Sequence, residues 1–293
     1  MKTRATKART MKHLLIGVLL VSWRVAATTE ATPHRIVSII PAVTEMIFAI
    51  GEGSRVIGVS SYDRFPPQVE RLDRVGGLLD PNVEKILSLK PDLVIVYATQ
   101  AELKVRLAQA SIPYYSYEHR ELADVMQTIR AIGARIGAAP AANRLASDMD
   151  QQLDDVRRSV ARLPKPKTLL VLGREPRSLR RINVSGGYGF LHDMLVTAGG
   201  VDAFGDVKQQ SIDATTEMIL GRQPEVILEL RYGQQPAAAA IAREIRDWDA
   251  IASLPAVRSH RVYILSGDEF VVPGPRLVEA TRRFADTLHP NRH

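Results

Sequence analysis

The chain contains one sequence block twice, at residues 82–95 and again at residues 215–228. Each copy reads Glu, any residue, Ile-Leu, three residues, Pro, an acid and then a run of apolar residues. A proline ends a helix because it disfavours helical backbone in the residue before it, and a short run rich in Val, Ile and Leu is typical of a buried strand. Each copy therefore predicts a helix that leads through a proline into a strand, once in each half of the chain.

Other segments of the same kind alternate along the sequence. The predicted strands are 35–40, 56–59, 93–97, 168–172, 226–230 and 262–265. The predicted helices are 44–50, 83–89, 101–109, 191–198 and 218–222. Strands that alternate with helices indicate an α/β architecture in which right-handed crossovers join mainly parallel strands. Together with the repeat, this alternation predicts two lobes of similar build.

Residues 140–163, between the two halves, have the pattern of one long helix. The apolar residues on its predicted face are Ala142, Leu145, Met149, Leu153, Val156 and Val160. Pro140 favours the start of this helix and Pro164 its end. About 22 residues at 1.5 Å each span roughly 33 Å, the width of a small domain. We therefore expect a rigid helix that joins two lobes and limits hinge motion, although an ordinary helix within one domain has the same pattern.

The formal charge of +7 originates at the start of the chain. Residues 1–27 hold six of the 39 Lys and Arg residues and no acid, so 33 bases face 32 acids in the remainder. The apolar run 14–21 follows the basic stretch, and the small residues Ala26 and Ala27 come after it. This is the pattern of a secretory signal peptide, and its apolar run is too short to span a bilayer. We expect cleavage between residues 27 and 31 and a periplasmic protein; an amphipathic helix of a cytoplasmic protein is the alternative.

Composition and motifs exclude several classes of function. The chain has no cysteine, which excludes a disulfide framework, a thiolate metal site, a cysteine nucleophile and a lipid-modified N-terminal cysteine. A remainder of nearly zero net charge has no basic footprint for nucleic acid. The chain has no Gly-x-Ser-x-Gly, phosphate-loop or His-Glu-x-x-His motif, and only His289 and His293 lie four residues apart. We therefore expect no enzyme, no bound metal, no cofactor of its own and no lipid anchor.

Several motifs resemble those of the periplasmic solute-binding proteins of ABC importers. They are Arg-Ile-Val-Ser-Ile-Ile-Pro at 35–41, Thr44-Glu45, Val-Ile-Gly-Val-Ser-Ser-Tyr at 56–62, Pro66-Pro67 and the block at 83–95. More narrowly, the chain resembles the helical-backbone cluster that serves cobalamin, haem and ferric siderophores, and it is most similar to the cobalamin-binding members. The similarity runs from about residue 35 to residue 290, nearly the whole predicted mature chain.

This resemblance implies two α/β lobes bridged by one long helix, with the ligand held in a crevice between the lobes. The expected boundaries are 28–139 for the N-terminal lobe, 140–163 for the bridging helix and 164–293 for the C-terminal lobe. It also implies a monomer that docks onto the membrane permease subunits of an importer. Glu84 and Glu217 match the family's two docking acids, one in each lobe. The alternative is that each is a first-turn acid stabilised by its helix dipole.

For the ligand, the resemblance points to four side chains. Tyr62 and Tyr97 match aromatic contacts of the cobalamin-binding members, and both follow predicted strands of the first lobe. Asp268 matches a contact acid of the second lobe, and Phe270 lies beside it in Ser-Gly-Asp-Glu-Phe. A flat macrocycle stacks well on tyrosine rings, which is consistent with a corrinoid ligand. The alternative for each tyrosine is a half-buried residue at the rim of its own lobe.

The chain also departs from those members. Their other contacts align here with Leu78 or Leu79, Asn183, Ser211 and Val272. The haem binders of the cluster carry an iron-ligating Tyr directly after a Val-Gly pair, but Gly77 stands in that position here. Ferric siderophores usually require Arg or Tyr, which the chain offers as Arg174, Arg177, Arg180, Arg181 and Arg231.

These features together predict the binding component of an importer. We expect its ligand to be a corrinoid first, a ferric siderophore second and haem third. A secreted sensor that presents its ligand to a receptor without transport is the alternative from another class.

Overall fold

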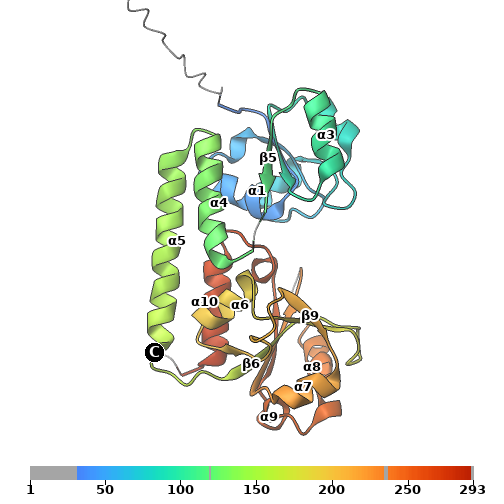
Figure 1. The fold of residues 1–293 in the computed structure, drawn as a ribbon, viewed down its shortest axis with the longest axis vertical. Helices are drawn as coiled ribbons and strands as arrows, with labels where there is room; N and C mark the ends of the chain where they lie inside the picture. Colours follow the sequence, from blue (N-terminus) through green and yellow to red (C-terminus); the bar gives the residue numbers. More distant parts are fainter. Residues whose placement is uncertain (1–31, 119, 234–236, 292–293) are drawn as a thin grey trace, which may run out of the picture. The chain divides into compact units, whose positions relative to one another are not determined.

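The computed structural model describes residues 32–118, 120–233 and 237–291 (Figure 1). The predicted signal peptide lies outside these residues. No helix in the described ranges is long and apolar enough to cross a membrane. Residues 32–293 form one compact unit, which contains both lobes.

The first lobe is built on a five-stranded parallel sheet in the order β3-β2-β1-β4-β5. Its strands are β1 (Ile36–Ser38), β2 (Val56–Val59), β3 (Asp73–Arg74), β4 (Leu93–Tyr97) and β5 (Tyr114–Tyr117). The crossover helices are α1 (Pro41–Ala49), α2 (Val83–Ser88) and α3 (Ala101–Gln109). Parallel strands with helices on both faces have largely apolar sequences, which made β1, β2 and β4 predictable. The structure confirms all three. The sequence pattern missed β3 and β5, which are short or partly exposed strands.

The second lobe is built on a six-stranded sheet in the order β11-β10-β6-β7-β9, with β8 paired to β6. Its strands are β6 (Lys167–Gly173), β7 (Ile182–Ser185), β8 (Val201–Asp202), β9 (Ser211–Ala214), β10 (Val226–Arg231) and β11 (Val262–Ser266). Its helices are α6 (Phe190–Thr197), α7 (Thr216–Arg222), α8 (Ala238–Arg246), α9 (Pro255–Arg258) and α10 (Leu277–Leu288). Two α/β lobes are thus confirmed, but this sheet is mixed, since β7 is antiparallel to both β6 and β9.

The repeated block builds the same unit in each lobe. In the first copy α2 leads into β4, and in the second α7 leads into β10. Ile86 and Ile219, at equivalent places in the two helices, are fully buried. Lys90 and Gln223, each directly before the proline, have left-handed φ angles of 48° and 50°, which end the helix and turn the chain toward the strand. The two copies therefore match in backbone geometry as well as in sequence.

The acid that follows each proline has a structural role. The Asp92 carboxylate accepts hydrogen bonds from the backbone N–H groups of His34 and Arg35, both at 2.8 Å. In the second lobe Glu225 accepts from the backbone N–H of Lys167 at 3.0 Å. Each acid thus ties the strand that it precedes to the start of the neighbouring central strand, which explains why both copies of the block carry an acid there.

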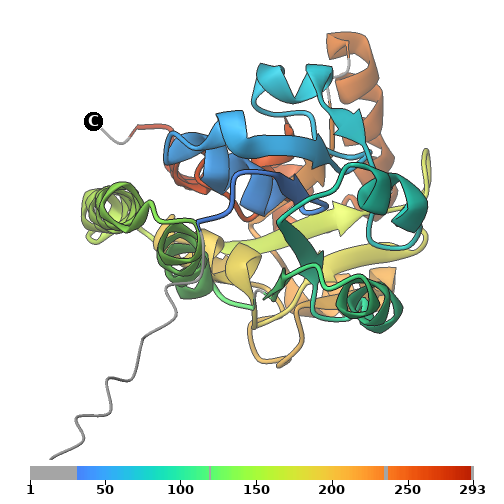
Figure 2. The same ribbon diagram turned by 90° about the horizontal axis from the view of Figure 1, so that it is seen from above.

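Two antiparallel helices connect the lobes. The predicted long helix is α5 (Ala139–Val160), and α4 (Leu122–Arg135) lies against it, as Figures 1 and 2 show. A Cβ atom on Gly133 of α4 would lie 2.1 Å from the Cβ of Ala142 in α5, so the backbone of α4 packs directly against the Ala142 side chain. The first residue of α4 is tied to the second lobe, because the Leu122 N–H donates to Asp193 at 2.9 Å. The connection therefore has two helices where the sequence predicted one.

A common core makes the connection stiff. One hydrophobic cluster joins buried residues of the first sheet, both connecting helices and α10, among them Ile36, Ile129, Leu153 and Phe284. A second cluster fills the far side of the second lobe around Trp248. Because close-packed interiors resist deformation, the shared cluster limits how far the lobes can move apart.

Candidate functional site

A pocket of about 390 Å³ lies between the lobes. The first lobe lines it with Asp63, Arg64, Glu70 and Arg74, and the second with Gly233, Gly267, Asp268, Glu269 and Arg276. Most of these residues follow β2, β10 and β11 at their carboxyl ends. Ligands of α/β proteins bind beyond the carboxyl ends of their strands, so we take this pocket, called the crevice below, as the candidate site.

Three tyrosines lie near the crevice. Tyr62 follows β2 and is 53% exposed, whereas Tyr97 ends β4 and is half-buried. Burial raises the pKa of Tyr97 to about 12, with further contributions from Asp63 and Tyr232. The Tyr232 hydroxyl donates a hydrogen bond to the Tyr62 carbonyl at 3.1 Å, which joins the two lobes. Sequence reasoning missed Tyr232. It comes two positions after the predicted strand 226–230 and directly follows β10, and Tyr62 comes in a similar place three positions after the end of β2.

The absence of a side chain at Gly77 leaves room for the Tyr62 ring. A Cβ atom on Gly77 would lie 2.6 Å from Cε2 of Tyr62, so the phenol ring covers the backbone of this glycine. Any larger residue at position 77 would push the ring aside. The Tyr62 ring can therefore occupy this position only because residue 77 has no side chain.

In the second lobe the structure separates the two predicted contacts. Asp268 lines the crevice, and its carboxylate accepts a hydrogen bond from the backbone N–H of Gly233 at 2.9 Å. Phe270 is fully buried and stacks on Phe284, with ring centroids 5.7 Å apart and planes at 6°. The guanidinium of Arg283 covers its ring at 4.5 Å. The prediction that Phe270 faces the ligand is corrected, because its side chain belongs to the core.

A buried ion pair crosses between the lobes. Arg276 donates to both carboxylate oxygens of Glu45, at 3.0 and 2.5 Å. Glu45 is only 4% exposed; burial raises its pKa, and the hydrogen bond and charge of Arg276 oppose that rise. The same guanidinium lies 4.2 Å from the ring centroid of Phe65. Sequence reasoning missed this pair because its members are 231 residues apart and no local pattern links them.

The arginines of the crevice are already engaged. Arg74 donates to the backbone carbonyls of Ser60 and Asp63, at 2.9 and 2.8 Å. Arg64 covers the ring of Tyr232 at 5.5 Å, and Arg276 is held by Glu45. An anionic ligand would therefore have to displace the contact with Glu45 to reach Arg276, whereas Arg64 and Arg74 are exposed.

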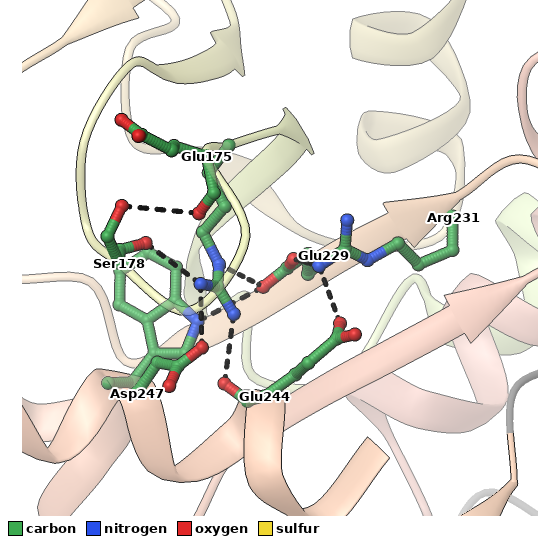
Figure 3. Close-up of polar contacts among 8 residues, drawn as sticks. Glu175, Ser178, Glu229, Arg231, Glu244 and Asp247 are labelled. Carbon is green, nitrogen blue, oxygen red and sulfur yellow. Dashed lines mark hydrogen bonds and ion pairs between the residues drawn. The ribbon is translucent and has the colours of Figure 1, made fainter. Parts of the chain in front are cut away.

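The arginines proposed for siderophore binding lie elsewhere. Arg174 is buried in the second lobe, where it donates to Glu229 at 3.0 Å and to Asp247 at 2.9 Å. Figure 3 labels both of these acids. Arg231 pairs with the same Glu229 at 2.7 Å and with Glu244 at 2.5 Å. Both guanidinium groups thus have structural partners. The remaining three, Arg177, Arg180 and Arg181, are exposed between β6 and β7 and do not line the crevice.

The two predicted docking acids occupy equivalent places. Glu84 and Glu217 are each the second residue of a short helix whose first turn is capped by a side chain, Asn82 in α2 and Thr215 in α7. Both glutamates are exposed, and neither takes part in an ion pair within the described ranges. Hydrogen bonds from its own backbone N–H and from Thr215 lower the pKa of Glu217. Each lobe thus presents one exposed carboxylate at the start of a helix.

A second hollow, of about 520 Å³, lies among α4, α5 and α6 and contains His192. Nδ1 of His192 lies 3.2 Å from the buried Asp202, which also accepts from the backbone N–H of Phe204. The nearby Ser185 hydroxyl is buried and donates to the carbonyl of Gly186. No group of three or more His, Asp or Glu side chains in the described ranges is arranged to hold a metal ion.

Comparison with known proteins finds a matching family and similar proteins along most of the chain. Residues 36–269 match the family described as periplasmic binding protein. An uncharacterized ABC transporter substrate-binding lipoprotein of Bacillus subtilis is 28% identical over 272 residues, which cover 90% of this chain and 82% of that protein.

Two solved structures are similar as well. The periplasmic vitamin B12-binding protein of Vibrio cholerae superposes with a TM-score of 0.75 at 28% identity, over 88% of this chain and 98% of that one. A periplasmic haem-binding protein of Roseiflexus superposes with a TM-score of 0.70 at 27% identity, over 87% of this chain and 98% of that one. The relatives therefore include binders of both vitamin B12 and haem.

Proposed function

Because the chain belongs to the periplasmic binding protein family, we propose that it is the binding component of an ABC importer and carries a corrinoid in the crevice. In this proposal it acts as an exported periplasmic monomer, catalyses no reaction and delivers its ligand to a membrane permease. The family supports the importer role, and the vitamin B12-binding relative from Vibrio cholerae supports the class of ligand.

The observation that carries the choice of ligand is the contrast between the tyrosines and the arginines of the crevice. The exposed ring of Tyr62 offers an aromatic face on which a flat macrocycle can stack, and the exposed ring of Tyr232 offers the face that Arg64 leaves open. Haem and many ferric siderophores carry carboxylates, which arginine binds best, yet Arg276 is already paired with Glu45. A corrinoid has a rim of neutral amides and needs no free cation.

The ligands that a haem iron needs also favour a corrinoid over haem. A haem iron takes an axial ligand such as a tyrosine phenolate, which must lose its proton. Burial and the charge of Asp63 raise the pKa of Tyr97 to about 12, which opposes the phenolate form. The position at which the resemblance places an iron-ligating tyrosine is Gly77, and the Tyr62 ring fills the space that its side chain would need. Haem therefore ranks below a corrinoid.

A corrinoid is larger than the 390 Å³ of the crevice, so its entry requires the lobes to part at the mouth. The hydrogen bond from Tyr232 to Tyr62 crosses this mouth and breaks on opening. The shared core of α4, α5 and α10 keeps the motion small. Loaded protein then presents Glu84 and Glu217 to basic residues of the permease, which orient the complex.

Replacing Tyr62 by alanine tests the aromatic wall. We expect Tyr62→Ala to bind cyanocobalamin about tenfold more weakly than the wild type, because it loses one stacking face. The measurement is a calorimetric titration of both proteins. Tyr114→Ala is the matched control, since Tyr114 is also an exposed tyrosine but lies at the amino end of β5, whereas Tyr62 follows the carboxyl end of β2 beside Asp63 of the crevice. Equal affinity of all three proteins would contradict a stacking role for Tyr62.

A further inference from the structure

Asp63 has a carboxylate oxygen without a partner. Its side chain is 2% exposed, and its Oδ2 accepts two hydrogen bonds from Ser60, from the backbone N–H at 2.9 Å and from the hydroxyl at 2.5 Å. Its Oδ1 is buried and has no hydrogen-bond partner among the described residues. Buried polar atoms are nearly always satisfied, so an orphaned carboxylate oxygen in a ligand crevice requires an explanation.

The structure holds this carboxylate in a fixed position. The turn from Ser60 to Asp63 is closed by a hydrogen bond from the Asp63 N–H to the Ser60 carbonyl at 3.3 Å, and Arg74 donates to the Asp63 carbonyl. The Tyr62 N–H donates to the Ser60 hydroxyl at 3.1 Å, so one turn presents both Tyr62 and Asp63. Asp63 lines the crevice, and its rigid turn makes it a preorganised group.

The neighbouring cations do not satisfy the free oxygen. Arg276, which lines the same crevice, donates to Glu45 and Glu269. Arg74 reaches the backbone of the turn but makes no hydrogen bond to the Asp63 carboxylate. Burial raises the pKa of Asp63, which the hydrogen bonds from Ser60 and the nearby Thr44 hydroxyl oppose. The Thr44 hydroxyl has other acceptors, Ser38 at 2.9 Å and the Ile40 carbonyl at 3.2 Å. A bound molecule that brings a donor would therefore supply the partner that the oxygen lacks.

We propose that Oδ1 of Asp63 accepts a hydrogen bond from a neutral N–H donor of the ligand, a primary carboxamide, and selects this amide over the corresponding carboxylate. The inference deepens the proposed function and rests on it, because a corrinoid carries such amides around its ring. A carboxylate in the same place would set two anions against each other in a buried site, which is strongly unfavourable.

Asparagine at position 63 reverses the polarity of the contact. The N–H and O–H of Ser60 both donate, so the amide of Asn must turn its oxygen toward Ser60. Its NH₂ group then points to the place of the free oxygen and offers a donor where the wild type offers an acceptor. Asp63→Asn should therefore disfavour an amide N–H of the ligand and tolerate a carboxylate.

The test titrates wild type and Asp63→Asn with cyanocobalamin and with its monocarboxylic acids, in which one peripheral amide is hydrolysed. We expect the wild type to bind at least one of these acids about tenfold or more weakly than cyanocobalamin. Asp63→Asn should bind cyanocobalamin about tenfold more weakly and recover the affinity for that acid. The matched control is Asp148→Asn, an exposed aspartate of α5, which should behave as wild type.

Each outcome bears on a different claim. If the wild type binds all the acids as tightly as cyanocobalamin, the role of Asp63 is overturned while the corrinoid function stands. Unchanged cyanocobalamin affinity in folded Asp63→Asn also overturns it. If the wild type binds no cyanocobalamin at all, the proposed function fails and the inference fails with it. Should Asp63→Asn not fold, Asp63→Ala takes its place in the same titrations and should lose the preference for the amide over the acid; an unchanged preference would assign it to another acid of the crevice and overturn the role of Asp63.

Discussion

Replacing Arg174 by methionine is expected to lower the free energy of unfolding by about 3–5 kcal/mol. The side chains of Arg174 and Glu229 are both fully buried, and the guanidinium makes four hydrogen bonds, two of them to the carboxylates of Glu229 and Asp247. Methionine fills a similar volume but removes one of the two cations that pair with the buried Glu229, so that only Arg231 remains, as the labelled residues in Figure 3 show. Breaking a buried ion pair by removing one partner is far more costly than breaking an exposed one. Urea unfolding followed by circular dichroism measures the change.

Two further variants make this prediction specific. Arg157→Met breaks an ion pair with Asp154 in which both side chains are more than half exposed, and it should cost less than about 1 kcal/mol. Adding Glu229→Gln to Arg174→Met removes the buried charge that then has only Arg231 as a cationic partner, and it should recover part of the loss. If Arg174→Met were no more destabilising than Arg157→Met, the network would not hold the second lobe together.

Reversing both predicted docking acids, Glu84 and Glu217, is expected to abolish uptake. In the double variant Glu84→Arg and Glu217→Arg, each helix start would carry a positive charge toward a permease surface that we propose to be basic, so attraction becomes repulsion at both lobes. Because both side chains are exposed and outside the crevice, ligand affinity should stay at the wild-type value. The measurement is transport of labelled cyanocobalamin into cells that have the cognate permease and lack their own binding protein.

The matched control reverses two other acids that also lie in the first turn of a helix. They are Glu102 in α3 and Glu279 in α10, and both are exposed. Reversing this pair makes the same change in net charge and in helix dipole interaction, so any general effect on folding or solubility appears in both variants. Normal uptake by the Glu84→Arg and Glu217→Arg variant would reject the docking role and favour a sensor that presents its ligand without transport.

The parts of the fold that the sequence predicted are those encoded by local patterns. The central strand β4 is a continuous apolar run because both of its faces are covered, and β10 is apolar apart from Glu229 and Arg231. The repeat located Glu84 and Glu217, since a helix start followed by a proline and a strand is readable from adjacent residues. By contrast, α4 was missed although its partner α5 was found. The antiparallel pairing of β7 also depends on a neighbouring strand and is invisible in a short window.

The crevice was predictable only in part. Tyr62, Tyr97 and Asp268 lie at or beside it because they end or follow predicted strands, whose carboxyl ends share one edge of a sheet. Phe270 comes two residues after Asp268, yet its ring turns into the core, a difference that a motif does not show. The ion pair of Glu45 and Arg276 depends on contacts between distant segments. Residues this far apart share no local sequence pattern, so their pairing is seen only in the structure.

The most direct test of the central claim is a competitive calorimetric titration of the wild-type protein with cyanocobalamin, haemin and a panel of ferric siderophores. The account predicts saturable binding of one cyanocobalamin per chain, with a higher affinity than for haemin or any siderophore of the panel. A cyanocobalamin dissociation constant weaker than about 1 mM, or roughly −4 kcal/mol, would contradict it, as would tighter binding of haemin.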